Sequence, residues 1–180
     1  FASQEFGVEP DMMTMAKATT NGVVPMGVVA CKDEIYDAVM DASPKGAVEL
    51  FHGYTYSGIP VSVAAALAVQ EIFEKEDIFN KVKGMVSYFQ KGLFSLKDLD
   101  SVENIRGYGL MGGIDMKMNV KPGKAGYECF KSCYKAGVNF KATGDCLIIA
   151  PQFICEKKHI DEIIDKLRTG ISNYQKNLKN

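Results

Sequence analysis

A stretch of small apolar residues constrains the fold more than any other feature of these 180 residues. Residues 61–75 have the spacing of a helix, and Pro60 stands where the first turn of a helix tolerates a proline. Alanine, valine, leucine and isoleucine fill most positions of this segment, so it has little polar face. A helix that is apolar on all sides is normally buried. We therefore expect residues 61–75 to be covered on most sides.

The chain changes character on either side of this helix, which predicts an α/β fold in two units with a boundary near residue 75. Residues 1–58 contain short apolar runs and turns typical of strands. Residues 77–97 show the apolar spacing of an amphipathic helix. Residues 100–180 are predicted to form a compact α/β unit. Its expected elements are strands at 102–105, 110–116 and 146–150, and helices at 123–136 and 157–178.

Composition and charge exclude several classes of partner. The chain has 21 basic and 22 acidic residues, a net charge of −1 and no block of like charge, so nucleic acid is not an expected partner. The apolar run at 61–69 is too short to span a bilayer, and no signal peptide opens the chain. Five cysteines without a CxxC pair, and two distant histidines, predict no metal site and a cytoplasmic protein.

An amine at the end of a predicted strand is the first candidate for chemistry. Lys17 closes the apolar run at 12–16, and Asn21-Gly22 turns the chain shortly afterwards. We expect such an amine to be held at a sheet edge and partly desolvated there. Desolvation favours the neutral form, which attacks carbonyl groups. A solvated surface lysine is the alternative interpretation.

A hydroxyl in a glycine-containing loop is the second candidate. Thr55 lies between Gly53 and Gly58, and these glycines let the backbone come close to a ligand. A hydroxyl beside free backbone N–H groups suits a phosphate dianion. Tyr54 and Ser57 are weaker candidates, because aromatic residues before a helix belong more often to a core.

Two blocks of the sequence resemble the class III aminotransferases, and within them the omega-amino acid:pyruvate (beta-alanine:pyruvate) transaminases. One resembles the segment that carries the family's catalytic lysine, with the residues Phe6-Gly7-Val8-Glu9-Pro10-Asp11-Met12-Met13-Thr14-Met15-Ala16-Lys17, Thr20-Asn21-Gly22 and Pro25-Met26-Gly27-Val28-Val29. The other resembles the family's phosphate-contacting loop, with the residues Phe51-His52-Gly53-Tyr54-Thr55-Tyr56-Ser57-Gly58 and Pro60. The blocks follow one another in the family's order and spacing.

The resemblance implies the C-terminal part of a transferase fold that depends on pyridoxal 5'-phosphate. Residues 1–75 would be the remnant of the large cofactor-binding domain with its linking helix, and residues 76–180 the small C-terminal α/β domain. Phe1 is not an initiator methionine, and the family's N-terminal part is missing. We therefore expect a fragment that is inactive alone. The acid facing the pyridine nitrogen, the phosphate cup and the aromatic that stacks on the ring should lie upstream of Phe1.

The resemblance also implies roles for individual residues. Lys17 would bind the cofactor covalently and move the proton during the reaction. Thr55 would reach the phosphate of the neighbouring subunit's cofactor, so the active site would be shared across a homodimer. Ile59 stands where relatives usually have histidine, which removes a polar contact near the entrance.

Lys141 departs from the family's pattern. The transaminases it resembles often have arginine at this position, which clamps a substrate carboxylate. Lysine keeps the charge but loses the planar fork, so we expect weaker and less selective carboxylate binding. The alternative is an exposed lysine without a role.

The resemblance implies transfer of an amino group from an omega-amino acid or amine, such as beta-alanine, to pyruvate. One alternative is another class III aminotransferase, acting on ornithine-type, 4-aminobutyrate or diamine substrates. Another is a non-catalytic remnant that pairs or binds a phosphorylated ligand. The segment Arg106-Gly107-Tyr108-Gly109-Leu110 resembles the family's RGxGL segment. Because it precedes a predicted strand, it does not fit a dinucleotide-binding turn, and we expect Arg106 to be structural.

Overall fold

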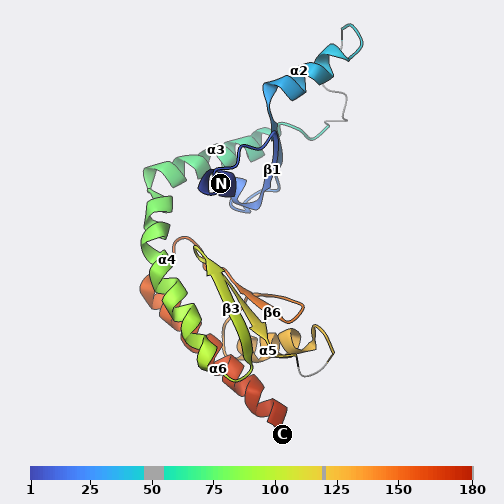
Figure 1. Ribbon diagram of the computed structural model, residues 1–180. Helices are drawn as coiled ribbons and strands as arrows, with labels where there is room; N and C mark the ends of the chain where they lie inside the picture. Colours follow the sequence, from blue (N-terminus) through green and yellow to red (C-terminus); the bar gives the residue numbers. More distant parts are fainter. Residues whose placement is uncertain (47–54, 119–120, 180) are drawn as a thin grey trace. The chain divides into compact units, whose positions relative to one another are not determined.

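The computed structural model describes residues 1–46, 55–118 and 121–179 (Figure 1). The chain divides into two compact units, Phe1–Glu76 and Asp77–Asn180. Each unit has its own sheet, and the two sheets share no strand.

The N-terminal unit contains a two-stranded antiparallel sheet, as the apolar runs predicted. Strand β1 (Met12–Ala16) pairs with β2 (Gly27–Cys31), from Met12 opposite Cys31 to Ala16 opposite Gly27. A one-turn helix, α1 (Ala2–Glu5), precedes the sheet, and a 3-10 turn, η1 (Lys17–Thr19), follows β1 directly. Helices α2 (Asp33–Asp41) and α3 (Pro60–Lys75) complete the unit.

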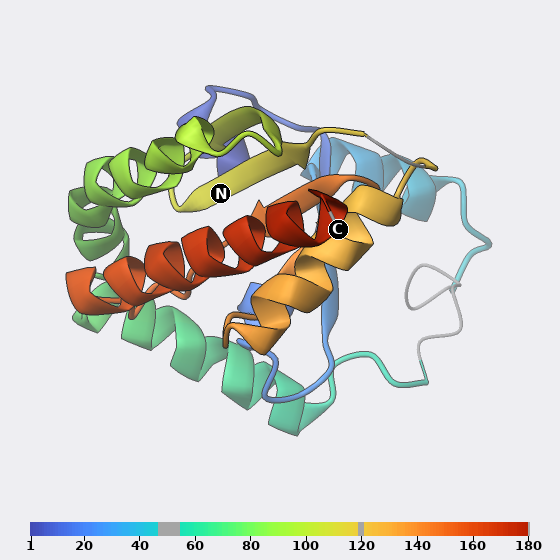
Figure 2. The same cartoon turned by 90° about the horizontal axis from the view of Figure 1, so that it is seen from below.

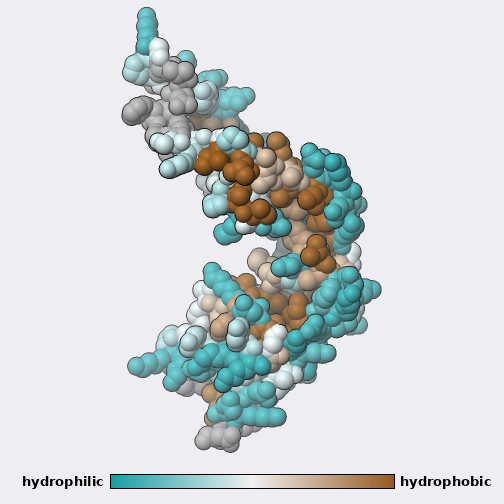
Figure 3. All heavy atoms as spheres, turned by 180° about the vertical axis from the view of Figure 1, so that it is seen from behind, coloured by the Kyte–Doolittle hydropathy of each residue, from teal (hydrophilic) through white to brown (hydrophobic). Residues whose placement is uncertain are grey.

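Helix α3 forms where the sequence predicted it, with Pro60 in its first turn. Its expected burial is wrong for this chain. Only Ser62 and Val69 of its sixteen residues are buried, while Val61 and Leu67 are each 61% exposed. Apolar side chains gather on the surface over α3 (Figure 3). The helix packs on η1, and a turn beside a two-stranded sheet is too small to cover sixteen residues.

The C-terminal unit is a four-stranded antiparallel sheet with helices against one face. The strand order is β3 (Val102–Tyr108), β4 (Met111–Met116), β6 (Cys146–Ile149) and β5 (Lys141–Thr143). Helices α4 (Ile78–Phe94), α5 (Lys124–Lys135) and α6 (Lys157–Lys179) lie in front of the sheet in Figure 2. A 3-10 turn, η2 (Ser95–Asp98), continues α4 and replaces the end of the helix predicted at 77–97.

One core joins this sheet to its helices. Leu93 of α4, Ile114 of β4, Leu147 of β6 and Leu167 of α6 are completely buried within it. Alternate residues of β4 and β6 are buried, as expected for strands with one covered face. A Cβ atom on Gly112 would collide with a methyl carbon of Leu93, so Leu93 would have to move to accommodate a side chain there.

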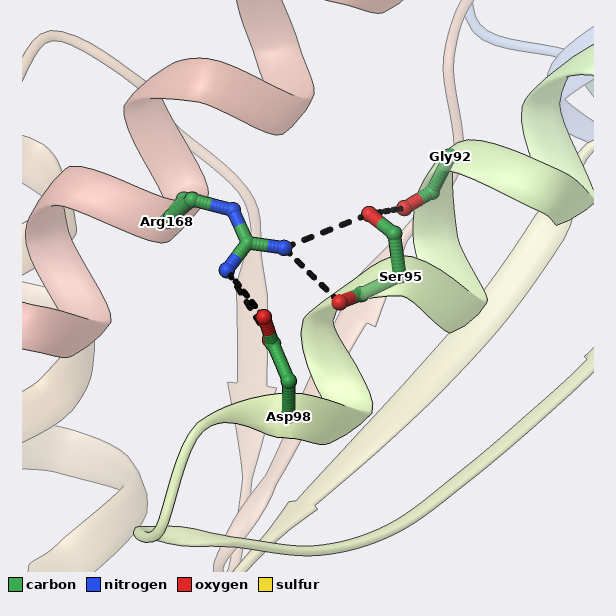
Figure 4. A network of polar contacts seen from close by, with 4 residues as sticks. All are labelled: Gly92, Ser95, Asp98 and Arg168. Atoms are coloured by element: carbon green, nitrogen blue, oxygen red, sulfur yellow. Dashed lines mark hydrogen bonds and ion pairs between the residues drawn. The ribbon is translucent and has the colours of Figure 1, made fainter.

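A polar network fixes the end of α4 to α6 (Figure 4). Arg168 of α6 donates through Nη1 to both oxygens of Asp98 and through Nη2 to the carbonyl of Ser95 at 2.7 Å. The Ser95 hydroxyl in turn donates to the carbonyl of Gly92 at 2.6 Å. These side chains thus bind carbonyl groups at the end of α4 and the start of η2.

Candidate active site

Lys17 lies where β1 ends and the chain turns. It is the first residue of η1, and its φ of 56° is in the left-handed region that non-glycine residues rarely adopt. Its carbonyl accepts hydrogen bonds from the N–H groups of Thr20 and Gly22, at 3.3 and 3.2 Å. The start of the Lys17 side chain is therefore fixed by a tight, hydrogen-bonded turn.

The loop between β1 and β2 is held together by a buried threonine. Thr20 is 2% exposed, and its hydroxyl donates to the carbonyl of Val24 at 2.7 Å. Asn21 and Gly22 both have positive φ values, as the predicted Asn-Gly turn requires. This loop gives Lys17 a rigid base, although the sequence alone did not identify Thr20 as its anchor.

The side chain of Lys17 is exposed in this chain. The described residues therefore do not remove its amine from water, and the expectation of partial desolvation is wrong for the chain by itself. The reason is the same as for α3, because a two-stranded sheet has too little mass to cover what lies at its end.

Thr55 lies in the turn at 55–58 that leads into α3, and its side chain is exposed. Gly58 in this turn has a φ of 67°, a conformation that glycine adopts without strain. The first turn of α3 carries no acidic side chain. A hydroxyl can bind an anion, and Thr55 precedes the first residue of α3 by five positions. His52, Gly53 and Tyr54 of the predicted loop lie outside the described residues.

Lys141 begins β5, a three-residue strand that the sequence analysis did not anticipate. It pairs with Ile148 of β6, and its side chain is exposed. The structure therefore places Lys17 and Thr55 in the N-terminal unit and Lys141 in the C-terminal unit.

The hairpin that carries Lys141 is anchored by Asp145, which the sequence analysis missed. One carboxylate oxygen of Asp145 accepts the N–H of Gly123 at 2.8 Å, and the other accepts the N–H of Gly126 at 3.0 Å. These backbone hydrogen bonds hold the pKa of Asp145 below its ordinary value. The signal in the sequence was Gly144-Asp145, a pair typical of a two-residue hairpin turn.

Arg106 is part of a small polar cluster on the sheet. It forms an ion pair with Asp115 of β4 and lies 3.4 Å from the sulfur of Cys146 on β6. Gly113, between them in the sheet, provides the room for the guanidinium group. Hydrogen bonding to Asp115 raises the pKa of Arg106 further above its ordinary value. The cluster ties three adjacent strands together, in keeping with the structural role expected for Arg106.

No helix in residues 1–46, 55–118 or 121–179 combines the length and apolar character needed to cross a membrane. The same part of the chain contains no group of three or more His, Cys, Asp or Glu side chains placed to hold a metal ion.

Known proteins resemble both the sequence and the structure. The family profile described as aminotransferase class-III matches residues 1–171. The omega-aminotransferase of Caulobacter vibrioides is 40% identical over 169 residues, which cover 93% of this chain and 38% of that protein. The beta-alanine--pyruvate aminotransferase of Pseudomonas aeruginosa is 38% identical over 176 residues, which cover 94% of this chain and 38% of that protein.

A solved structure described as a transaminase with L-ala superposes with a TM-score of 0.92. It is 28% identical, and the match covers 99% of this chain and 43% of that one. The chain therefore belongs to the class III aminotransferases, and the family suggested by its two sequence blocks is confirmed. Its α/β fold is part of the fold of the PLP-dependent transferases, as expected. The chain spans about 38% of the length of the relatives it matches.

Proposed function

We propose that this chain is the C-terminal part of an omega-amino acid:pyruvate aminotransferase that uses pyridoxal 5'-phosphate. The family match over residues 1–171 carries the proposal, because it spans both units and includes the turn that fixes Lys17. Relatives named for omega-amino acids and for beta-alanine with pyruvate favour this branch. In this proposal residues 1–75 belong to the large cofactor-binding domain and residues 76–180 form the small domain.

Two side chains of the N-terminal unit suit the aldehyde and the phosphate of the cofactor. An amine suits its aldehyde, and a hydroxyl in a glycine-containing turn suits its phosphate. We assign the first role to Lys17 and the second to Thr55. When bound, the cofactor supplies an electron sink for the substrate carbon that carries the amino group. Lys17 then holds and returns the proton at its Nζ, and the tight turn at its backbone limits where that atom can reach.

Both residues are exposed in this chain, which bears on the assembly. An amine that must act in its neutral form needs a drier site than the described residues provide. We propose that the site is completed by the part of the relatives' length that this chain does not span, and by a second subunit in a homodimer. We place the enzyme in the cytoplasm, since its five cysteines are free thiols.

Lys141 is assigned to the carboxylate of the amino donor. Its exposed ammonium group at the start of β5 offers a charge without the planar geometry of arginine. We therefore propose that the enzyme accepts donors with a distant carboxylate, such as beta-alanine, and tolerates amines that lack one. The alternatives are another class III aminotransferase, acting on ornithine-type, 4-aminobutyrate or diamine substrates, and a non-catalytic remnant.

The test is to trap the cofactor in the complete enzyme that the proposal requires. Reduction with borohydride, followed by mass spectrometry of the peptides, should place the pyridoxyl group on Lys17. The Lys17→Ala variant should lose the visible absorbance of the cofactor and all transamination. Lys75→Ala removes another lysine from the same unit, one that pairs with Glu71 on the surface, and should change neither property. A label on another lysine, or absorbance that survives in Lys17→Ala, contradicts the assignment.

A substrate panel separates the alternatives. The complete enzyme should transfer the amino group of beta-alanine to pyruvate. If 2-oxoglutarate replaces pyruvate as the preferred acceptor, one of the other aminotransferase types is favoured. If the protein stays colourless with pyridoxal 5'-phosphate and leaves Lys17 unlabelled, the remnant is favoured.

A further inference from the structure

The turn between β5 and β6 is fixed to a helix that lies far from it in the sequence. Asp145 accepts hydrogen bonds from the N–H groups of Gly123 and Gly126, which lie 22 and 19 residues earlier at the start of α5. These N–H groups have no partner inside the helix, and the positive end of the helix dipole faces the same carboxylate. The contact therefore links the tip of the hairpin to the N-terminus of α5.

Steric fit supports the same link. A Cβ atom on Gly126 would lie 2.8 Å from the Cα of Asp145 and would collide with the carbonyl oxygen of Gly144. Helix and turn are thus packed backbone to backbone, which only glycine allows at this position. Gly144 has a φ of 57°, so the turn itself also depends on a glycine. Charge and packing together leave the hairpin tip little freedom.

Strand β5 is the shortest strand of this sheet and ends at the anchored turn. It contains only Lys141–Thr143, stands at the edge and pairs with β6 alone. Its three pairs, Lys141 with Ile148, Ala142 with Leu147 and Thr143 with Cys146, end at the turn that Asp145 holds. Short edge strands fray easily. The turn that Asp145 holds therefore fixes one end of β5, while Phe140 and Ala142, which pack against the core, flank Lys141.

We infer that Asp145 is a positioning residue for Lys141, and through it for the carboxylate end of the amino donor. The inference rests on the proposed function, because it takes Lys141 to bind that carboxylate. Asp145 itself is engaged by backbone N–H groups of α5, so it acts through the hairpin and not by touching the substrate. The inference predicts that loosening the turn lowers kcat/KM for donors that have a distant carboxylate and leaves kcat/KM unchanged for donors that lack one.

The experiment compares two donors in the complete enzyme with its cofactor bound. Beta-alanine has the carboxylate, and 1-phenylethylamine lacks it. Asp145→Asn keeps the shape of the side chain but can accept through only one oxygen, so one of the two N–H groups loses its partner. We expect kcat/KM for beta-alanine to fall about tenfold, mainly through KM, and that for 1-phenylethylamine to change by less than about twofold.

Two comparisons make the result specific. Lys141→Met should produce the same selective loss, and the double variant Lys141→Met/Asp145→Asn should lose no more than Lys141→Met alone, because both changes remove one function. Asp98→Asn is the matched control. It also converts a hydrogen-bonded carboxylate of the C-terminal unit to an amide, but it loosens the contact with Arg168 and should not discriminate between the donors.

The outcomes separate this inference from the function on which it rests. If Lys141→Met affects both donors equally, the proposed role of Lys141 fails and the inference fails with it. If Lys141→Met is selective while Asp145→Asn affects both donors equally, or adds its full effect to that of Lys141→Met, only the positioning role of Asp145 fails. Should Asp145→Asn not fold, Asp145→Glu keeps the charge and displaces the turn by one methylene. A selective loss in that variant supports the inference, and an equal loss for both donors overturns it.

Discussion

Nη1 of Arg168 lies 2.9 Å from each of the two carboxylate oxygens of Asp98, seventy residues earlier in the chain. This contact fixes the end of α4 and the turn η2 against α6 (Figure 4). The same guanidinium group also donates to the carbonyl of Ser95, the first residue of η2. One side chain thus joins two helices that form the core of the C-terminal unit.

Arg168→Met should destabilise the C-terminal unit modestly. Asp98 is 63% exposed and Arg168 37%, so solvent weakens the attraction, and we expect a loss of about 1 kcal/mol in the free energy of unfolding. Hydrogen exchange of core amides in β4 and β6 measures this unit by itself. Lys158→Met, in the same unit, breaks the more exposed pair with Glu156 and should cost almost nothing. Equal losses in the two variants contradict the role given to Arg168.

Two glycine-to-alanine substitutions in helices should have opposite effects. At Gly126 a side chain would collide with the hairpin turn, so Gly126→Ala should destabilise the C-terminal unit by about 2 kcal/mol. Gly84 in α4 has open space around it, so Gly84→Ala should stabilise the unit by about 0.5–1 kcal/mol through helix propensity. Chemical denaturation of the two variants, followed by far-ultraviolet circular dichroism, provides the comparison. A tolerated alanine at 126 contradicts the close packing of α5 on the turn.

Because of Asp145, the unfolding free energy of the C-terminal unit should fall at acidic pH. Its folded pKa is held below the ordinary value of 3.8 by the N–H groups of α5, so the unfolded chain binds the proton more readily. The stabilising contribution is therefore fully present above the unfolded pKa and is lost as the pH falls through the folded pKa. The difference in unfolding free energy between the wild type and Asp145→Asn should be constant near neutral pH and shrink below about pH 4. A difference that stays constant down to pH 2 contradicts this assignment.

Local pattern predicted most of the elements, because it depends on residues close together in the sequence. The spacing of apolar residues and Pro60 gave the bounds of α3 almost to the residue. Strand β5 was missed, because Lys141–Thr143 is too short to show an alternating pattern. The burial of α3 was predicted wrongly, since burial depends on which neighbours a chain provides and not on the helix itself.

The residues of the candidate site also divide into those that local sequence predicted and those that only the structure identified. Lys17 and Thr55 could be proposed from short motifs. The turn at Asn21-Gly22 supported the choice of Lys17. Gly144-Asp145 indicates a hairpin turn, but the anchoring role of Asp145 could not be found like this, because its partners lie about twenty residues away and are backbone groups, which look alike in any sequence. Contacts of this kind follow from the fold, so they become visible only with the structure.

The backbone conformation of Lys17 can be tested separately from its amine. Its φ of 56° costs a non-glycine residue about 1–2 kcal/mol. Lys17→Gly removes this strain and Lys17→Ala does not. Hydrogen exchange of the paired amides in β1 and β2 should therefore report the N-terminal unit as about 1 kcal/mol more stable in Lys17→Gly than in Lys17→Ala.

The order should reverse at Lys75, in the last turn of α3, where the backbone is helical. There glycine is less favourable than alanine, by up to about 1 kcal/mol. Neither variant at position 17 retains an amine, so in the complete enzyme both should fail to retain the cofactor despite their different stabilities. If Lys17→Ala proves at least as stable as Lys17→Gly, the left-handed conformation at the end of β1 is contradicted. Loss of cofactor in both variants would then still support the amine, because the two properties are measured independently.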